Sequence, residues 1–512
     1  MLIKTYSSAV YGIKATTITI EVNISAGTQY FIVGLPDSAI KESTFRVESA
    51  LQSIGYRMPR QKIVINMAPA DIKKEGSAYD LAMALGILAA SGQIQATRLG
   101  DYLILGELSL DGGLQRVAGV LPIAIQAKSE GFKGMILPRA NAREAAIVDG
   151  LEVYGLDTLK EVVQLITGEA EPAPIRVDTH AEFLYNMNNY EFDFSDVQGQ
   201  ENIKRALEIA AAGGHNVILI GPPGAGKTML AKRLPSILPP LSLQESLETT
   251  KIHSVAGRIA AAGSLMTVRP FRAPHHTVSD VALVGGGGNP QPGEISLAHN
   301  GVLFLDELPE FKRSVLEVLR QPLEERQMTI SRAKRTVDYP ASFMLIASMN
   351  PCPCGYHNHP DKDCVCSPAI VQRYLSKVSG PLLDRIDLHV EVTPVGFQDL
   401  TGKRLAERSE AIRKRVEHAR SIQIARFKGA AQIHCNAQMG SNQVREICQL
   451  TDAGEELLRN AMERIGLSAR AYDRILKVSR TIADLADSPT IEITHLAEAI
   501  HYRSLDRAGW AG

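Results

Sequence analysis

Short stretches of alternating apolar and polar residues recur in the first third of the chain. Residues 17–22 and 62–66 alternate with a period of two, which predicts half-buried β-strands. The apolar stretch 81–90 is long enough for a buried helix. We therefore expect residues 1–168 to form an α+β domain.

A different pattern follows, in which short runs are apolar throughout. The runs 217–220, 301–305 and 343–348 each end at polar or glycine residues. Short apolar runs of this kind are typical of buried β-strands, and helical segments lie between them. It predicts an α/β core over residues 191–395. The Pro-rich stretch 169–190 before it is expected to be an interdomain linker.

Apolar residues recur at helical spacing in the last part of the chain, residues 396–512. The expected helices cover residues 403–426, 455–465, 469–484 and 493–503. These segments predict a C-terminal helical lid.

The first apolar run leads into a glycine-rich loop, and a helical segment follows. The loop reads Gly221-Pro222-Pro223-Gly224-Ala225-Gly226-Lys227-Thr228. Between a strand and a helix, this pattern is typical of a P-loop, whose backbone N–H groups surround phosphate oxygens at a helix N-terminus. Lys227 is expected to reach the β- and γ-phosphates, and Thr228 to complete the Mg²⁺ shell. ATP and Mg²⁺ are the predicted cofactors.

The two later apolar runs end at further candidate catalytic residues. Asp306 and Glu307 follow the second run, as in a Walker B segment. Asp306 would hold Mg²⁺ through water, and Glu307 would polarise the attacking water. Asn350 follows the third run and suits a sensor of the γ-phosphate; the alternative is a turn asparagine before Pro351.

Two arginines complete the predicted catalytic set. Arg385 stands where AAA+ ATPases supply a finger to the neighbouring subunit, and its planar charge suits a phosphoryl group. Arg470 opens a helix of the lid and resembles a sensor 2 residue that would close over the nucleotide. Arg474, one turn later, competes for that role.

Four cysteines form two C-x-C pairs in the insert 352–366. Four thiolates suit a tetrahedral structural Zn²⁺ site, which would leave no position for catalysis. His357 or His359 could replace one thiol, and unliganded thiols are the alternative. The four candidate ligands are Cys352, Cys354, Cys364 and Cys366.

Two other segments invite a functional interpretation. Residues 328–337 alternate like a hairpin with Arg332, Lys334 and Arg335 near its tip, which could follow DNA phosphates; a solvated hairpin is the alternative. His275 and His276 are expected to face opposite sides of an extended segment, as loop or interface residues rather than metal ligands.

Three segments around the second strand carry a family resemblance. They are Arg272–Ser279, Gly285–Gly288 and Gly293–Asn300. With the P-loop, they look like the Mg-chelatase-like AAA+ proteins, and nearly the whole chain resembles the ComM/YifB family. The resemblance implies an S5-like (Lon-protease-like) N-terminal domain, an AAA+ core and a helical lid. It also implies homo-hexameric rings and an ATP-driven DNA helicase that moves branched junctions during recombination, with single-stranded or branched DNA as its partner.

The N-terminal domain resembles the C-terminal domain of Lon proteases in Gly106–Gly112 and Gly131–Pro138. Lon proteases use a Ser–Lys dyad, in which the amine activates the hydroxyl. Leu121 stands at the lysine position, and Ser77 is expected in a turn before a helix. ATP-dependent proteolysis is therefore disfavoured.

The overall composition is that of a globular protein without a dominant charge. A net charge of −1 over 512 residues gives no global basic field. Without a signal-like N-terminus or an apolar run of about 20 residues, we expect a cytoplasmic protein with no membrane partner.

A Mg-chelatase-type remodeller of a protein or metal-chelate partner is the main rival to a DNA motor. The sequence lacks the Asp-x-Ser-x-Ser stretch that the partner domain of such a remodeller carries. A nucleotide-gated scaffold is disfavoured by Glu307, Asn350 and Arg385.

Overall fold

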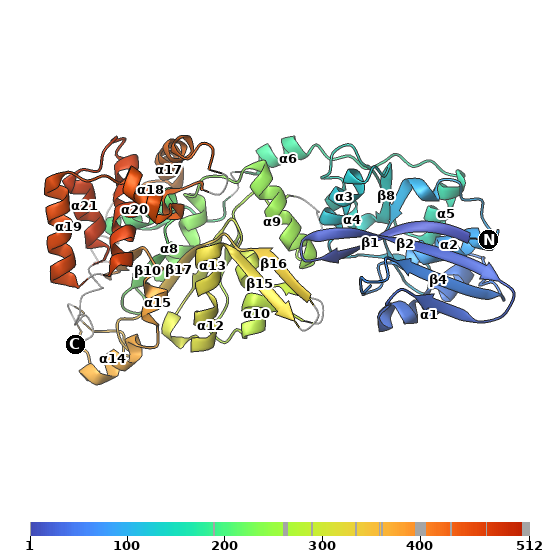
Figure 1. The fold of residues 1–512 in the computed structure, drawn as a ribbon, viewed down its shortest axis with the longest axis horizontal. Helices are drawn as coiled ribbons and strands as arrows, with labels where there is room; N and C mark the ends of the chain where they lie inside the picture. The colour runs from blue at the N-terminus through green and yellow to red at the C-terminus, as the bar shows by residue number, and fades with distance from the viewer. Residues whose placement is uncertain are drawn as a thin grey trace.

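The computed structural model describes most of the chain. The described residues are 2–187, 190–259, 265–287, 290–332, 335–357, 359, 362–394, 406–430, 433–466 and 468–503. They form three successive parts along an elongated molecule, with the N-terminal domain, the core and the helical C-terminal part in a row (Figure 1).

A seven-stranded mixed sheet forms the N-terminal domain, with the strand order β3-β4-β2-β1-β5-β8-β9. The predicted strands and the apolar helix are present. Its main strands are β1 (Leu2–Tyr11), β2 (Lys14–Ser25), β3 (Tyr30–Val33), β4 (Lys62–Ala68), β5 (Tyr102–Ile104), β8 (Gly134–Pro138) and β9 (Glu152–Leu156); β6 (Glu107–Leu108) and β7 (Leu114–Gln115) form a separate small ladder.

Helices cover this sheet and bury its apolar side chains. All residues of α2 are buried, which explains why its sequence is apolar on every side. The helices are α1 (Ser38–Ser53), α2 (Asp80–Ala90), α3 (Val120–Ser129), α4 (Arg139–Ala145) and α5 (Leu159–Thr167).

The Pro-rich segment after α5 has more structure than the linker prediction suggests. Ile175 bridges to Val153 of the N-terminal sheet. Helix α6 (Thr179–Asn186) begins at an Asp178 cap and buries Phe183. The segment therefore packs against the N-terminal domain, because its few apolar residues find a surface there.

A five-stranded parallel sheet organises the core, in the order β11-β14-β17-β10-β18. The three apolar runs form its three central strands, as predicted. Its strands are β10 (Val217–Ile220), β11 (Phe271–Arg272), β14 (Val302–Leu305), β17 (Met344–Met349) and β18 (Leu388–Glu391). Candidate residues that follow β10, β14 and β17 therefore meet at one edge of the sheet.

Helices and two short hairpins surround the parallel sheet. The helices are α7 (Glu201–Gly213), α8 (Lys227–Arg233), α9 (Leu243–Val255), α10 (Asp280–Val284), α11 (Glu294–Leu297), α12 (Arg313–Val318), α13 (Arg320–Glu325), α14 (Pro368–Leu375) and α15 (Gly380–Leu383). The hairpins are β12 (Gly285–Gly286) with β13 (Gln291–Pro292), and β15 (Gln327–Arg332) with β16 (Arg335–Pro340).

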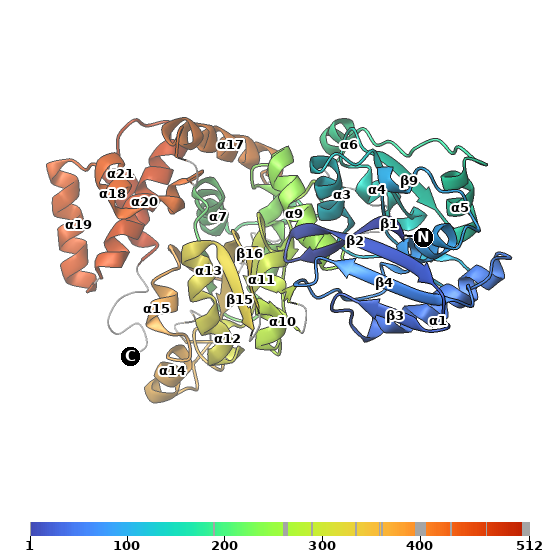
Figure 2. The same ribbon diagram turned by 45° about the vertical axis from the view of Figure 1, so that its right-hand side comes forward.

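The helical C-terminal part packs on the core through α17 and α20, both of which contact α7. Its helices are α17 (Ser409–Arg426), α18 (Ser441–Ile447), α19 (Asp452–Ile465), α20 (Ala469–Leu485) and α21 (Ile493–His501). The expected helix over 403–426 begins later within the described residues, at Ser409. Figure 2 shows this part at the far end from the N-terminal sheet.

Among the described residues, the N-terminal domain contacts the core through α3 and through the turn between β1 and β2. Helix α3 packs on α9, where the Gly119 N–H donates to the Ser254 carbonyl at 3.0 Å. The turn between β1 and β2 packs on the β15–β16 hairpin, and Tyr11 lies in one apolar cluster with Val337. In Figure 2 the hairpin lies beside the end of β1 and β2 that faces the core.

Candidate nucleotide site

The glycine-rich loop turns between β10 and α8 as the motif predicts. Gly224 and Gly226 have positive φ angles of 79° and 83°, which favour glycine. Gly221 must lack a side chain for a different reason, because a Cβ there would lie 2.2 Å from the Val392 carbonyl oxygen. The loop thus ends at the N-terminus of α8 in the shape that a phosphate cradle needs.

Lys227 points back across the loop. Its ammonium donates to the carbonyls of Gly221 and Pro222 at 2.7 and 2.9 Å, and to Asn350 Oδ1 at 3.1 Å. Burial lowers the pKa of Lys227, although the carboxylates of Asp306 and Glu307 oppose this shift. The structure therefore brings together the predicted phosphate-binding lysine and the predicted sensor.

Asp306 lies at the centre of the same edge of the sheet. The Thr228 hydroxyl donates to its Oδ2 at 2.7 Å, and the Ser348 hydroxyl donates to its Oδ1. Two hydroxyls around one carboxylate form the kind of oxygen-rich group that Mg²⁺ prefers.

Glu307 follows Asp306 in a left-handed backbone conformation, with φ of 54°. Such a conformation costs roughly 1–3 kcal/mol in a residue other than glycine, and these costs cluster at functional sites. The carboxylate remains largely exposed, and its Oε2 lies 3.4 Å from His276 Nδ1. A general base that accepts a proton from the attacking water must be accessible to that water, and the exposed Glu307 carboxylate is accessible.

The two adjacent histidines do not face opposite sides, so that prediction is wrong. The rings of His275 and His276 lie against each other in a tilted arrangement, with centroids 4.0 Å apart and their planes at 34°. The segment turns at this point, because the Thr277 N–H donates back to His275 Nδ1 at 3.4 Å. Alternation of side chains, which holds for an extended strand, therefore ends before His275.

The four cysteines of the insert gather into one cluster, and their Sγ atoms all lie within 4.8 Å of one another. Sγ–Sγ distances are 3.3 Å for Cys352–Cys354, 3.7 Å for Cys352–Cys364 and 3.6 Å for Cys354–Cys364. A Zn²⁺ ion with Zn–S bonds of 2.3 Å would place tetrahedral sulfurs about 3.8 Å apart. The donor set and its spacing fit zinc, and neither candidate histidine belongs to the cluster.

The local environment favours one thiolate in this cluster, at Cys354; at Cys364 and Cys366 backbone N–H groups also favour the thiolate, but burial and the neighbouring cysteines raise the pKa values. Burial opposes ionisation of Cys354, but backbone N–H groups and the Cys352 thiol lower its pKa to about 6. The thiolate is the form that binds metal.

The cysteine cluster also touches the P-loop. A Cβ built on Gly355, whose φ is 86°, would lie 2.5 Å from Pro223 Cδ. The short turn that contains Cys352, Cys354 and Gly355, called the knuckle below, therefore lies directly against the phosphate-binding loop.

Arg385 and Arg470 both lie near Asp384, away from the P-loop of their own chain. They flank Asp384, to which Arg470 is joined at 3.7 Å. The Asp384–Asp387 segment precedes β18, whereas the P-loop follows β10, and these strands are parallel. The arginines are thus at the opposite end of the sheet, and the structure does not place Arg470 over its own nucleotide.

Arg385, Arg470 and Arg474 each pair with a different carboxylate, and they differ in burial. Arg385 is buried and pairs with Glu324 of α13 at 2.5 Å, whereas Arg470 is largely exposed. Arg474, the competitor of Arg470, is held by the buried Asp387 at 2.8 Å.

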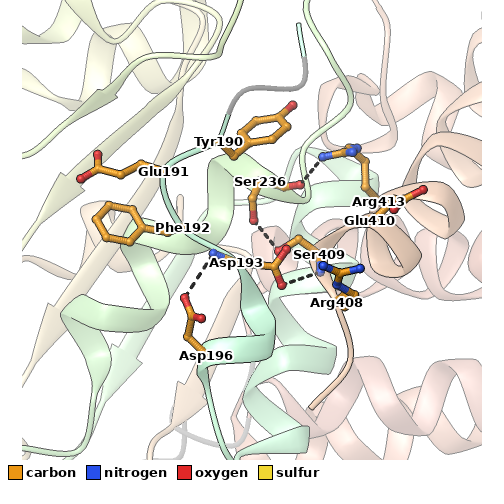
Figure 3. A pocket seen from close by; sticks show the side chains of 10 residues that line it. All are labelled: Tyr190, Glu191, Phe192, Asp193, Asp196, Ser236, Arg408, Ser409, Glu410 and Arg413. Atoms are coloured by element: carbon orange, nitrogen blue, oxygen red, sulfur yellow. Dashed lines mark hydrogen bonds between the residues drawn. The ribbon is translucent and has the colours of Figure 1, made fainter. Parts of the chain in front are cut away.

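A polar pocket of about 500 Å³ lies where residues 190–196 meet the N-terminus of α17 (Figure 3). Its side chains largely satisfy one another: Asp193 accepts from the Ser409 N–H at 3.1 Å, and Arg413 donates to the Ser236 carbonyl at 3.0 Å. The pocket marks the joint between the core and the helical part, and the P-loop is not part of its lining.

Three family models match successive parts of the chain. They are subunit ChlI of Mg-chelatase at residues 20–141, magnesium chelatase subunit ChlI at 193–400, and the ChlI C-terminal model at 406–503. Competence protein ComM of Haemophilus influenzae is 46% identical, and the match spans 98% of this chain and 97% of that protein. The chain belongs to the Mg-chelatase-like AAA+ family.

Other relatives support this membership and the predicted ComM/YifB resemblance. The uncharacterized protein YifB of Escherichia coli is 44% identical over 98% of this chain and 97% of its own length. Membership of an AAA+ family supports ATPase activity, with ATP and Mg²⁺ as cofactors. The parallel core, the helical C-terminal part and the Lon-like N-terminal homology agree with the predicted fold class.

The Lon-like homology covers only the first part of the chain. Lon protease 2 of Bacillus subtilis is 30% identical over 28% of this chain and 26% of that protein. Leu121, which we predict to stand at the position of the Lon lysine, is buried in an apolar cluster with Phe183 and Leu241. Ser77 lies in the turn before α2, and its hydroxyl donates to Glu107. Leu121 therefore packs against Leu241 of the core domain.

The predicted DNA-contacting residues are only partly described. The β15–β16 hairpin is present, but Lys334 and the side chains of Arg332 and Arg335 lie outside the described residues. Among the described helices, none combines the length and hydrophobicity needed to cross a membrane.

Three side chains that contact predicted catalytic or nucleotide-binding residues were not predicted from the sequence. Ser348 stands two residues before the predicted sensor Asn350, and its place in an otherwise apolar run could have drawn attention to it. His276 and Glu324 reach Glu307 and Arg385 from distant segments. For Glu324 the sequence carries no signal.

Proposed function

We propose that the protein is an ATP-hydrolysing AAA+ motor that acts on DNA, as a homo-hexameric branch-migration helicase in recombination or transformation. One observation carries the hydrolytic part: Lys227, Thr228 and Asp306 converge with Asn350 and the exposed Glu307 at one edge of the parallel sheet.

Each of these side chains has a defined task in the proposed reaction. Lys227 binds the β- and γ-phosphates after exchanging its carbonyl partners for phosphate oxygens. Thr228 and Asp306 would hold Mg²⁺, which supplies positive charge beside the phosphate oxygens. Glu307 accepts the proton of the attacking water, and Asn350 orients the γ-phosphate or that water.

The ring assembly is supported by the position of the arginines. Arg385 and Arg470 lie beside Asp384, at the end of the sheet opposite the P-loop of the same chain. In a ring of identical subunits, that end can face the nucleotide of a neighbour. Arg385 must first leave Glu324, so the ion pair keeps the finger folded back until a neighbour's phosphate competes for it.

The DNA part rests on the hairpin and on the relatives. In the sequence, Arg332, Lys334 and Arg335 fall where strand β15 ends and β16 begins, and the apolar face of this hairpin packs on the β1–β2 turn. Cationic side chains on a supported hairpin can follow phosphates as the core changes shape. The name of the relative with 46% identity, a competence protein, supports a role in DNA uptake and recombination.

The DNA part is tested by branch migration of a labelled four-way junction. Wild-type protein with ATP is expected to convert the junction into duplexes, and Glu307→Gln is expected to leave it intact. Alanine substitutions at Arg332, Lys334 and Arg335 together are expected to stop migration while ATP hydrolysis without DNA continues. The matched control replaces three exposed cations of the N-terminal domain, namely Lys4, Lys133 and Arg139. Equal migration by the hairpin variant and this control would reject the DNA role of the hairpin.

The second candidate is ATP-driven remodelling of a protein or metal-chelate partner, which the ChlI family models favour. It predicts ATP hydrolysis that no DNA stimulates. Structural zinc at the cysteine cluster is proposed for either function.

A further inference from the structure

The segment after β11 runs alongside the Walker B segment. Strands β11 and β14 are parallel, with Phe271 opposite Val302 and Arg272 opposite Leu303. Beyond Arg272 the segment leaves this pairing and turns at His275, where the Thr277 N–H donates to His275 Nδ1 at 3.4 Å. After the turn His276 lies beside Glu307, with its Nδ1 3.4 Å from Oε2 of the carboxylate.

Neighbouring groups fix the position of His276. Its ring packs against the tilted ring of His275 and makes an edge contact with Phe311, with ring centroids 6.4 Å apart. The strand before it is anchored where Arg272 donates two hydrogen bonds to Glu294, at 2.6 and 2.8 Å. A bidentate pair of this kind holds the backbone in a defined place.

The Glu307 carboxylate needs such a fixed neighbour. Its side chain is 58% exposed, whereas that of His276 is 30% exposed. An exposed glutamate samples several rotamers, and only some of them point at a water in line with the γ-phosphate. The 3.4 Å between Nδ1 and Oε2 exceeds an ordinary hydrogen bond, but catalytic contacts often tighten when substrate binds.

We propose that His276 is a positioning residue that aims the Glu307 carboxylate at the attacking water. Nδ1–H donates to Oε2, which leaves Oε1 free to accept the proton of the water. The proposal rests on the proposed ATPase function. The role belongs to His276, and the sequence alone did not suggest it.

The test separates turnover from nucleotide affinity in purified protein. We would measure kcat, KM and binding of a fluorescent ATP analogue for wild type, His276→Ala, His276→Gln and Glu307→Gln. The matched control is His275→Ala, which removes the neighbouring ring but leaves the contact with Glu307. A base displaced by about 1 Å loses roughly 10²-fold in rate, so kcat of His276→Ala is expected to fall by about 10–100-fold.

The remaining variants identify the cause of that fall. Affinity for the ATP analogue is expected to stay at the wild-type level in His276→Ala. His276→Gln is expected to recover part of kcat, because its amide can still donate to Oε2. His275→Ala is expected to lose less activity than His276→Ala.

Three results would overturn the proposal: unchanged kcat in His276→Ala, a parallel loss of nucleotide affinity, or equal losses in the two alanine variants. If wild type itself hydrolyses no ATP above the Glu307→Gln level, the proposed ATPase function fails first. The two failures are thus distinguishable.

Discussion

Loss of a single cysteine from the insert tests whether zinc supports the nucleotide site. Cys364→Ser removes one of four thiolates whose mutual distances match a tetrahedral ion. Changing even a second-shell partner weakens a metal site by about 10–100-fold. Loss of a ligand itself is therefore expected to weaken zinc binding by at least about 100-fold.

Loss of zinc is expected to slow ATP hydrolysis through the contact between Gly355 and Pro223. Gly355 lies so close to Pro223 that a Cβ there would be 2.5 Å from the proline ring, and the knuckle therefore limits the movement of the P-loop. If the loop moves by about 1 Å when zinc is lost, kcat/KM for ATP should fall by roughly 10²-fold.

Metal analysis and steady-state kinetics on the same preparations provide the assay. Wild type should contain one zinc ion per chain, and Cys364→Ser should contain almost none. Cys448→Ser is the matched control, since this cysteine is buried in the helical part away from the cluster. Zinc-free wild type, or full zinc in Cys364→Ser, would refute the metal site. Zinc loss with unchanged kcat/KM would refute the coupling to the P-loop.

Three further substitutions examine the catalytic residues and the interdomain joint. Glu307→Gln should bind ATP but hydrolyse it about 10²–10⁴-fold more slowly, as expected on loss of a general base; turnover near the wild-type rate in a phosphate-release assay would remove Glu307 from that role. Arg385→Ala should abolish hydrolysis alone yet regain activity when mixed with Glu307→Gln subunits, because each variant supplies what the other lacks; a lack of rescue in mixed rings argues against a finger in trans. Leu121→Lys restores the predicted Lon base but places an amine in a buried apolar cluster. It should destabilise the protein by about 2–5 kcal/mol, the usual cost of losing a buried leucine, and give no peptidase activity. Thermal denaturation and a casein assay check this, and casein cleavage would show that the site is still competent.

Much of the fold followed from local patterns. The apolar runs predicted β10, β14 and β17 because strands buried on both faces leave an uninterrupted hydrophobic signature. The P-loop was predictable because all of its chemistry lies in eight consecutive residues. The cysteine cluster was predictable for a similar reason, since short C-x-C spacings restrict the geometry of each pair.

Contacts between segments far apart in the sequence could not be predicted from local patterns. The pairing of Arg385 with Glu324 depends on how α13 packs relative to the segment before β18, and no local pattern records that. The position of Arg470 depends on how the whole helical part docks on α7. The linker prediction missed α6 because its helix gains stability from burying Phe183 against other elements.

The most direct test of the proposed motor function is the ATPase rate of purified protein without DNA and with single strands, duplex or a four-way junction. Glu307→Gln serves as the blank in each condition. A DNA motor is expected to show hydrolysis that DNA stimulates, most strongly with the junction. Hydrolysis at the same rate with every DNA would contradict the motor function and favour a protein or metal-chelate partner.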